Sequence, residues 1–323
     1  MVISSMDCIL QCLFGLNNIG MVKDIVINKS NENQDFTNFP FLLFKFFDKI
    51  QEKRNYKINN GDDIDNYLYN YNNSLKNFLK QFHHKCPSID SVKPTNIFSN
   101  ILFLFQKEFG PLTGWGSVTW DGQYPEPKDY PKNKFPKVID GIDNFQKNYK
   151  DILTDLFCFI LILSKRCPTC RSVYDAHSII KSFLPLNSQS KSKIATLITN
   201  YLGAKQTNNF IQCNCGYKGY LIEETEFYNT PNYLIVDLCE SSKIVFDTQI
   251  SLSDHTKIAK QYKLYAAINK CGDNNSNVKY VCSISEKEEG QEIWKYYEGN
   301  LIEKSGNEGL EMGTPSCAIY KKL

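Results

Sequence analysis

Apolar residues recur at helical spacing through much of the first half of the chain. The stretch SSMDCILQCLFGL places one apolar face on Met6, Ile9, Leu10, Leu13 and Phe14. This spacing predicts a helix, and the preceding Ser4 and Ser5 are the residue type that caps helix N-termini. The same pattern predicts amphipathic helices in four further segments: FPFLLFKFFDKIQEK, SLKNFLKQFHHK, TNIFSNILFLFQKEF and VIDGIDNFQKNYKDILTDLF.

Two other segments of this half are expected to be irregular. The stretch INKSNENQDFTN is polar, and residues 110–136 are rich in Gly, Pro, Asp and Trp, which favours loops. No stretch reaches the roughly 18 uninterrupted apolar residues that a membrane span needs. LFCFILILSK, which starts at Leu156, is shorter and is interpreted as a buried strand or the end of a helix.

The pattern changes to strands from Cys167 onward. Short β-branched or aromatic segments separated by turn residues predict strands in NYLIVDL, IVFDTQISL, YKLYAAINK, KYVCSIS, IWKYYEGNLI and SCAIYKKL. A helical half followed by a strand-rich half favours an α+β fold over alternating α/β.

Composition narrows the functional class. A net charge of +2 over 323 residues, without a basic stripe, gives no electrostatic case for direct nucleic-acid binding. The N-terminus lacks the basic start and the cleavage site of a signal peptide. Twelve cysteines without a secretion signal therefore favour the reducing cytoplasm or nucleus, where clustered thiols are metal ligands more often than disulfides.

Four of these cysteines form the most specific chemical pattern in the chain. They are Cys167 and Cys170 in CPTC, and Cys213 and Cys215 in CNCG. Two close thiolate pairs offer four soft ligands to a structural Zn²⁺, with no open position for a reacting water. The competing interpretation is four unrelated buried cysteines. Those in apolar or strand-like stretches are expected in the core: Cys158, Cys239, Cys271, Cys282 and Cys317.

Read in order, several segments resemble motifs of the ubiquitin-specific protease family. SSMDCILQCLF resembles the helix CYMNSxLQxLF, which begins at that family's catalytic cysteine, and DGIDNFQKNYKDIL loosely resembles QDAxEFLxxLLD. CPTC and CNCG fall where the family has its zinc-bearing fingers, and NTPNYLIVDL is similar to LPxxLxxxLxR. YKLYAAINKCGDNNSNVKYVCSI resembles YxLxAVxxHxGxxxxGHYxAY, IWKYYEGNLI resembles WxxFDDxxV, and SCAIYKKL resembles AYxLxY.

This resemblance implies a papain-like cysteine-protease fold with a right-hand architecture. Residues 1–323 would form one domain with a helical thumb over 1–155, zinc-bearing fingers over 156–240 and a mixed palm over 241–323. Residues 20–135 match the family poorly and are expected to be an insert within the thumb.

The catalytic positions that the resemblance implies are degenerate. The nucleophile position falls on Ser4, the His of GHY on Lys279 and the Gly before it on Val278. The acidic positions fall on Glu298 and Gly299. A serine hydroxyl needs a base to react, whereas a thiol is partly ionised on its own. A lysine would serve as that base only if burial lowered its pKa by several units. No catalytic residue is therefore expected.

Three functions remain open at this point. The first is an inactive scaffold or binding module that binds ubiquitin or belongs to a larger complex. The second is a thiol deubiquitinase that cleaves ubiquitin C-terminal bonds, with a nucleophile exchanged for serine or a different alignment. This would need His255, which precedes the expected strand instead of following it. The third is a zinc-ribbon nucleic-acid binder, which the near-neutral charge disfavours.

Two further residues and the chain start bear on this choice. Cys8 lies one helical turn beyond Ser4, on an apolar helix face, and is expected in the core. Only three residues precede Ser4, so the family's upstream oxyanion donor is missing, as a truncated start would produce.

Overall fold

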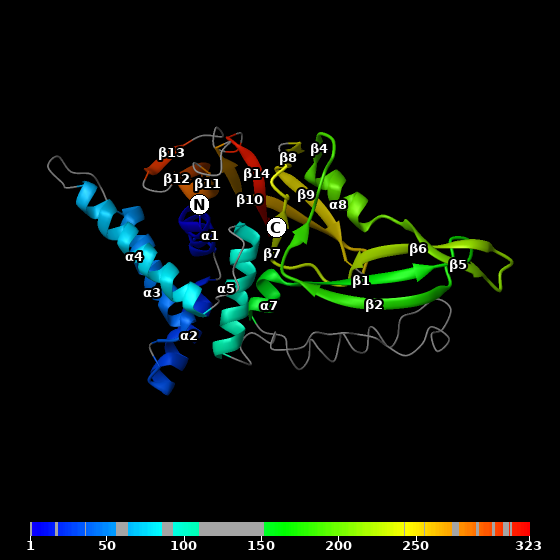
Figure 1. Ribbon diagram of the computed structural model, residues 1–323, viewed down its shortest axis with the longest axis horizontal. Helices are drawn as coiled ribbons and strands as arrows, with labels where there is room; N and C mark the ends of the chain where they lie inside the picture. The colour runs from blue at the N-terminus through cyan, green and yellow to red at the C-terminus, as the bar shows by residue number, and fades with distance from the viewer. Residues whose placement is uncertain are drawn as a thin grey trace. The chain divides into compact units, whose positions relative to one another are not determined.

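The computed structural model describes residues 2–323 apart from several segments (Figure 1). These segments are 17–18, 36, 56–63, 86–92, 110–151, 242, 255, 273–277, 289–290, 299–300, 306–309 and 311. The predicted loop over 110–136 and most of the predicted helix over 138–157 therefore lie outside the described residues.

The described helices lie mainly in the first third of the chain. They are α1 (Val2–Phe14), α2 (Ile19–Asn33), α3 (Phe39–Asn55), α4 (Ile64–Lys85), α5 (Pro94–Phe109), α7 (Ile152–Phe157) and α8 (Ile194–Leu202). The helices predicted at the N-terminus and in the segments that became α3, α4 and α5 are confirmed. The stretch from Leu156 is also as expected, because α7 ends at Phe157 and a buried strand follows it.

Two local predictions in this region are wrong, the first only in part. Residues 27–33 of the polar stretch interpreted as a loop form the second half of α2, because Val22, Val26 and Ser30 recur every four residues and are all buried on one face. The described residues 34, 35, 37 and 38 are not helical, as predicted. Ser4 and Ser5 do not cap α1, since the helix already includes Val2. Ser5 is instead fully buried within the helix.

The described strands form three sheets. They are β1 (Phe159–Arg166), β2 (Val173–Lys181), β3 (Leu184–Pro185), β4 (Ser192–Lys193), β5 (Lys205–Gln212), β6 (Lys218–Phe227), β7 (Tyr233–Asp237), β8 (Ile244–Val245), β9 (Gln249–Ser253), β10 (Ala259–Cys271), β11 (Lys279–Glu288), β12 (Gln291–Glu298), β13 (Leu301–Ser305) and β14 (Thr314–Lys322). Their order is β2-β1-β6-β5 in one sheet and β13-β12-β11-β10-β14-β7-β3 in the largest, where β9 also pairs with β10; β4 pairs with β8. Four of the six predicted strand segments correspond to single strands, β7, β10, β11 and β14, and the mixed α+β class is confirmed. The other two each divide: IVFDTQISL contains β8 and most of β9, and IWKYYEGNLI contains the end of β12 and the start of β13.

The chain divides into two compact units. The first comprises Met1–Leu112, Val236–Ser242 and Leu264–Ile319. The second comprises Thr113–Ile235, Lys243–Lys263 and Tyr320–Leu323.

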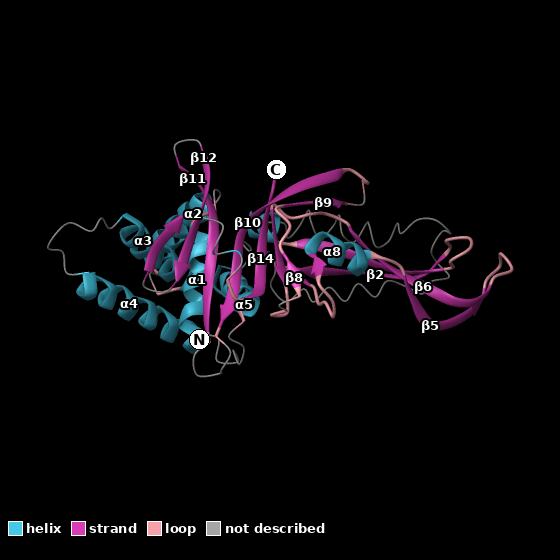
Figure 2. Ribbon diagram, turned by 90° about the horizontal axis from the view of Figure 1, so that it is seen from above, coloured by secondary structure: helices cyan, strands magenta, loops and turns pink. Residues whose placement is uncertain are grey.

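Helix α1 is central to the first unit. It contacts β11 and also the helices α3, α4 and α5 (Figures 1 and 2). Its apolar face is buried as predicted, and Cys8 is buried with it. An aromatic cluster packs α3 on α4, with Phe46 stacked on Phe78 at 5.2 Å between ring centroids and Phe39 next to both Phe78 and Phe82. Burial of these side chains fixes α3 and α4, which contact α1 through Tyr71 at Asp7 and Gln11 and through Phe47 at Phe14.

The second unit is built on the four-stranded sheet. β1 pairs antiparallel with both β2 and β6, and β6 pairs with β5. At one end, Phe159 packs edge-on against Phe227 at 5.2 Å between ring centroids. Toward the other end the side chains become more exposed, and two chain turns leave the sheet between β1 and β2 and between β5 and β6. These turns carry the cysteine pairs.

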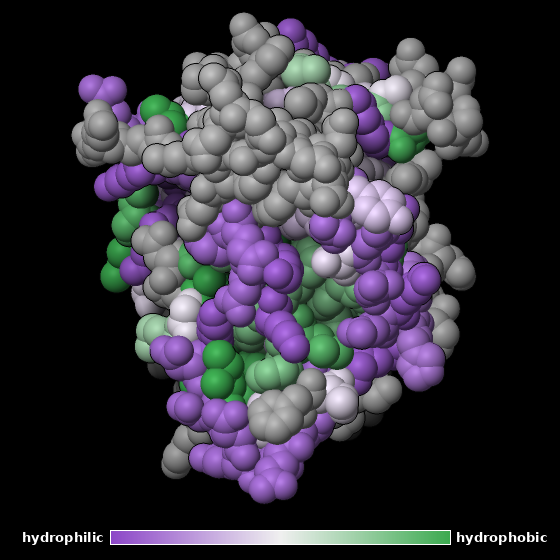
Figure 3. Space-filling view, turned by 90° about the vertical axis from the view of Figure 1, so that its left-hand side faces the viewer, coloured by the Kyte–Doolittle hydropathy of each residue, from purple (hydrophilic) through white to green (hydrophobic). Residues whose placement is uncertain are grey.

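The surface is predominantly hydrophilic on the face shown in Figure 3, where described hydrophobic side chains appear only in small groups. Among the described residues, large apolar side chains such as Met21 and Tyr69 are exposed singly, as is common on protein surfaces. Among the described residues no single helix is long and apolar enough to cross a membrane; α1 and α2 reach that length only as a pair bent by 99°.

Candidate functional site

Ser4 and Lys279, which the sequence predicts at the nucleophile and base positions, lie together in the first unit. Ser4 sits in the first turn of α1, and its Oγ accepts a hydrogen bond of 3.0 Å from the backbone N–H of Tyr280. Tyr280 directly follows Lys279, the first residue of β11. The contact between α1 and β11 therefore places Ser4 next to Lys279, although 275 residues separate them in the sequence.

The chemistry available at this contact is limited. Lys279 is exposed, so it lacks the burial by which a lysine loses its charge and becomes a base. Val278 beside it is buried. One turn beyond Ser4, Cys8 is buried, and desolvation, with the neighbouring Cys282 and Asp7, raises the pKa of its thiol well above the ordinary value. A buried thiol of this kind does not form the thiolate that a nucleophile requires.

The remaining candidates are less well placed or lie outside the described residues. Glu298 is the last residue of β12 and pairs with Leu301, while its side chain and Gly299 are not among those described. His83 and His84 lie in the last turn of α4, and His177 lies on β2. The alternative base His255 lies outside the described residues.

A partly buried polar network contacts β11 next to this site. The Glu240 carboxylate accepts a 2.6 Å hydrogen bond from the Tyr280 hydroxyl and forms a 2.6 Å ion pair with Lys270 Nζ. Glu240 lies in a tight turn after β7. Its φ is positive, 53°, and so is that of the preceding Cys239, 51°. Burial acts to raise the pKa of Glu240, but the bonds from Lys270 and Tyr280 outweigh it and the pKa lies below the ordinary value.

The four predicted metal ligands converge in the second unit. The Sγ atoms of Cys167, Cys170, Cys213 and Cys215 all lie within 4.8 Å of one another. The pairs across the two turns are closest, with 3.7 Å between Cys167 and Cys215 and 3.5 Å between Cys170 and Cys213. This arrangement could hold a metal ion, as the spacing of the cysteines predicted.

Backbone hydrogen bonds shape the two cysteine turns. Arg171 N–H donates to the Cys167 carbonyl at 2.9 Å, and Gly216 N–H donates to the Cys213 carbonyl at 2.9 Å. Both Arg171 and Gly216 have positive φ, 62° and 93°. Glycine adopts this conformation without strain, which accounts for Gly216 directly after the second pair. The Arg171 guanidinium is anchored by an ion pair to Glu224.

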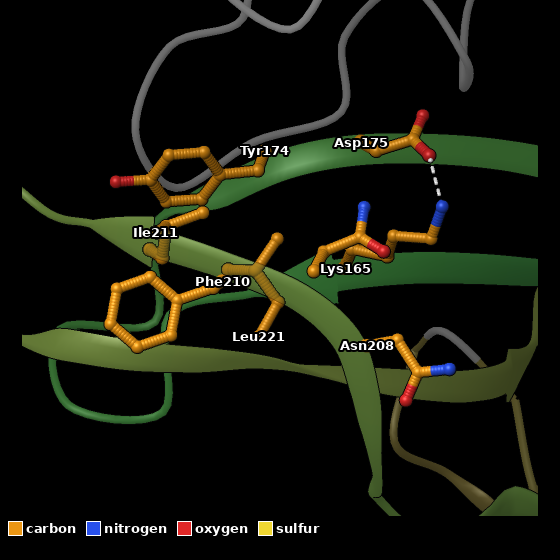
Figure 4. Close-up of a pocket in the computed structure, with 8 residues that line it drawn as sticks. Lys165, Tyr174, Asp175, Asn208, Phe210, Ile211 and Leu221 are labelled. Atoms are coloured by element: carbon orange, nitrogen blue, oxygen red, sulfur yellow. Dashed lines mark hydrogen bonds and ion pairs between the residues drawn. The ribbon is translucent and has the colours of Figure 1, made fainter.

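Other residues near the sulfurs were not foreseen from the sequence. Ser172 lies with its Oγ 3.1 Å from Cys170 Sγ, and hydrogen bonds from Ser172 lower the pKa of Cys170 to about 6. Tyr174 on β2 forms a hydrogen bond with Cys213, which raises the pKa of the Tyr174 phenol. Its ring also lines an open pocket of about 650 Å³ together with Phe210 and Ile211 (Figure 4).

The other cysteines follow the core prediction only in part. Cys158, Cys282 and Cys317 are buried, but Cys239 and Cys271 are only half-buried. Cys239 occupies the left-handed turn before Glu240, and Cys271 is the last residue of β10. Apolar flanking sequence does not distinguish a strand interior from its end, which explains the difference.

The family comparison covers nearly the whole chain. The model of the family described as ubiquitin carboxyl-terminal hydrolase matches residues 3–320. No curated protein matched the chain.

Solved structures match over the full length of this chain. A SAGA DUB module containing Ubp8, Sgf11, Sus1 and Sgf73 matches with a TM-score of 0.69 and 15% identity, over 99% of this chain and 67% of that chain. A yeast SAGA DUB module with a mutant Sgf73 matches with a TM-score of 0.67 and 16% identity, over 100% of this chain and 67% of that chain. A SAGA DUB module bound to monoubiquitin matches with a TM-score of 0.62 and 14% identity, over 99% of this chain and 67% of that chain. These likenesses establish the fold, over about two thirds of the matched chains.

Proposed function

Because the chain belongs to the ubiquitin carboxyl-terminal hydrolase family, we propose that it is a member that keeps the fold but does not hydrolyse ubiquitin conjugates. It acts instead as a protein-binding scaffold. The observation that supports this proposal is the 3.0 Å hydrogen bond between Ser4 and Tyr280, because it places Ser4, which we assign to the nucleophile position, beside Lys279, which we assign to the base position. Those residues are a serine and an exposed lysine.

The loss of activity follows from the chemistry of these two side chains. A serine hydroxyl becomes a nucleophile when a neighbouring base takes its proton. Lys279 is exposed, so it lacks the burial that turns a lysine into a base. Cys8 does not replace the missing thiol, because its sulfur is buried within α1 and β11. Glu298 and Gly299, at the acidic positions, have no imidazole to orient.

The four-cysteine cluster is proposed to hold a structural Zn²⁺. Four sulfurs about 2.3 Å from one zinc ion at tetrahedral angles lie about 3.8 Å apart. The distances of 3.7 Å and 3.5 Å across the two turns fit this geometry. A site with four protein ligands has no open position for a substrate or a water, so its role is to stabilise the sheet. A reducing compartment, the cytoplasm or nucleus, would keep the thiols available for the metal.

The partners are proposed to be proteins. The similar solved structures are multi-subunit modules, and one contains bound monoubiquitin. For this chain we propose either ubiquitin or a subunit of a larger complex as the partner. Val278 and Lys279 add bulk and charge at the catalytic position, so a retained ubiquitin contact would rely on surfaces away from it.

Two assays on the unmodified protein test this proposal. Incubation with ubiquitin carrying a C-terminal fluorogenic amide should release no fluorophore above the protein-free blank. Titration with ubiquitin, followed by affinity purification and mass spectrometry, should identify a protein partner. Hydrolysis by the unmodified protein would refute the proposed loss of activity and favour the thiol deubiquitinase alternative.

A further inference from the structure

The sulfurs of the four-cysteine cluster are not equally exposed. Among the cysteines that the structure describes, Cys215 alone is exposed; Cys170 is half-buried, and Cys167 and Cys213 are buried. The described cysteines outside the cluster are buried or half-buried. Soluble oxidants react with thiolates that they can reach, and binding to Zn²⁺ keeps a thiol deprotonated. Cys215 is therefore the thiol that an oxidant meets first.

The sulfur that faces Cys215 belongs to the other turn. Cys167 Sγ lies 3.7 Å from Cys215 Sγ, although the two residues are 48 positions apart in the sequence. The remaining two sulfurs, those of Cys170 and Cys213, lie 3.5 Å apart and also belong to different turns. The sulfurs of a disulfide are about 2.05 Å apart, so each pair has to close by less than about 2 Å.

Hydrogen bonds within each turn favour pairing across the turns. Cys167 N–H donates to the Ser172 carbonyl at 2.9 Å, and Cys213 N–H donates to the Tyr217 carbonyl at 2.8 Å. These bonds fix the backbone shape of the two turns. Only one residue separates Cys213 from Cys215, so a disulfide between them would have to distort a turn that is already closed. A disulfide across the turns joins two sulfurs that need only side-chain movement.

We propose that Cys215 is a site of oxidation by peroxides, with Cys167 as its resolving thiol, and that Cys170 and Cys213 then form a second disulfide. The bound metal leaves as its ligands are consumed. The inference rests on the zinc site of the proposed function only for this release, because the disulfides need the four sulfurs alone. Two covalent bonds then join the turns in place of the metal.

Each disulfide consumes one peroxide and two thiolates. The Cys215 thiolate attacks hydrogen peroxide, so that an S–O bond forms, the O–O bond breaks and hydroxide leaves. The Cys167 thiolate then attacks the sulfur of the Cys215 sulfenic acid. An S–S bond forms, the S–O bond breaks and a second hydroxide leaves. Both hydroxides take a proton from water, and two electrons pass from the two sulfurs to the peroxide. The second pair reacts in the same way.

Peroxide treatment of the metal-loaded full chain tests this inference. We expect hydrogen peroxide to release zinc to a chromophoric chelator, about one ion per chain, while the four thiols of the cluster are lost. Peptide mapping without reductant should identify linkages between Cys167 and Cys215 and between Cys170 and Cys213. Linkages within the turns, or four thiols that stay reduced, would refute the proposed pairing.

Two cysteine variants provide the comparison. In Cys215→Ser the Cys167 thiol should stay reduced at a peroxide dose that fully oxidises the unmodified cluster. Cys271→Ser is the matched control, because Cys271 is half-buried at the end of β10 and lies outside the cluster. This control should form both linkages and release zinc at the unmodified rate. Oxidation of Cys167 at an unchanged rate in Cys215→Ser would refute the role of Cys215.

The metal content before peroxide separates this inference from the proposal beneath it. A purified chain without zinc would refute the zinc site, while peptide mapping would still decide how the cysteines pair. Zinc release by peroxide without disulfides across the turns would refute the pairing and leave the zinc site standing.

Discussion

At the scale of single residues, Glu240 forms the centre of a polar network next to the contact between Ser4 and Tyr280. Its carboxylate binds both Lys270 and Tyr280, and the backbone of Tyr280 in turn binds Ser4. The Glu240 side chain is only 17% exposed, so removing its charge leaves Lys270 without an anionic partner in a partly buried position. The network therefore fixes the start of β11 instead of activating a nucleophile.

Glu240→Gln is expected to destabilise the protein by about 1 to 2 kcal/mol at pH 7, because a partly buried ion pair loses one charge. The pKa of Glu240 is lowered in the folded state, so its carboxylate stabilises the fold above the unfolded value of 4.5 and loses this effect as pH falls below it. The difference between the two proteins should therefore shrink below that pH. Urea unfolding of the two proteins at pH 7 and at a pH below 4.5 measures this difference in the free energy of unfolding.

Asp48→Asn is the matched control for this experiment. Asp48 pairs with Lys23 at 2.9 Å, but its side chain is 60% exposed. Exposed pairs contribute little, so the change should stay within about 0.5 kcal/mol. An effect of Glu240→Gln no larger than that of the control would contradict the structural role of the network.

At the scale of elements, the C-terminal end of α1 is fixed by a contact with β10. The hydroxyl of Tyr265 donates a 3.0 Å hydrogen bond to the carbonyl of Cys12, which lies in the last turn of α1, where carbonyls lack helical partners. A Cβ on Gly15 would overlap this hydroxyl. The glycine is therefore required by the close approach of Tyr265.

Gly15→Ala should lower the free energy of unfolding by more than about 1 kcal/mol, since either the hydroxyl moves or the hydrogen bond breaks. Gly20→Ala is the control, because Gly20 lies in α2 with nothing within 4 Å of the added Cβ. That substitution should be neutral or stabilise by up to about 1 kcal/mol. Thermal unfolding compares the two, and equal effects would contradict the proposed overlap.

The elements themselves were largely predictable from the sequence. The apolar face of α1 shows its helical periodicity directly, and strands such as β7 and β14 are marked by short runs of buried apolar residues. The second half of α2 was missed, since only Val26 and Ser30 mark its buried face among polar residues. The spacing of the four cysteines also predicted that their sulfurs would converge, as they do. The sequence could not predict Tyr174 or Glu240, whose partners are distant in the chain.

At the scale of the whole molecule, the four-cysteine cluster and the predicted catalytic positions belong to different compact units. All four cysteines belong to the second unit, while Ser4, Lys279 and Glu240 belong to the first. The four cysteines lie in the turn between β1 and β2 and the turn between β5 and β6, so the proposed Zn²⁺ would connect the two turns. Metal removal should therefore act on the four-stranded sheet first.

Hydrogen exchange with and without a chelator tests this separation. We expect faster amide exchange in β5, β6 and the start of β2 after metal removal, because the two cysteine turns lose the metal ion proposed to connect them. Exchange in α1 and β11 should change little. Equal acceleration in both units would show that the metal stabilises the whole chain instead.

The most direct test of the central claim is hydrolysis by Ser4→Cys. This variant restores a thiol at the nucleophile position but leaves Lys279 where the family places its histidine. We predict no turnover of ubiquitin bearing a C-terminal fluorogenic amide, since the thiol still lacks a base. Robust turnover by Ser4→Cys would contradict the account, because a single substitution at Ser4 would then explain the loss of activity.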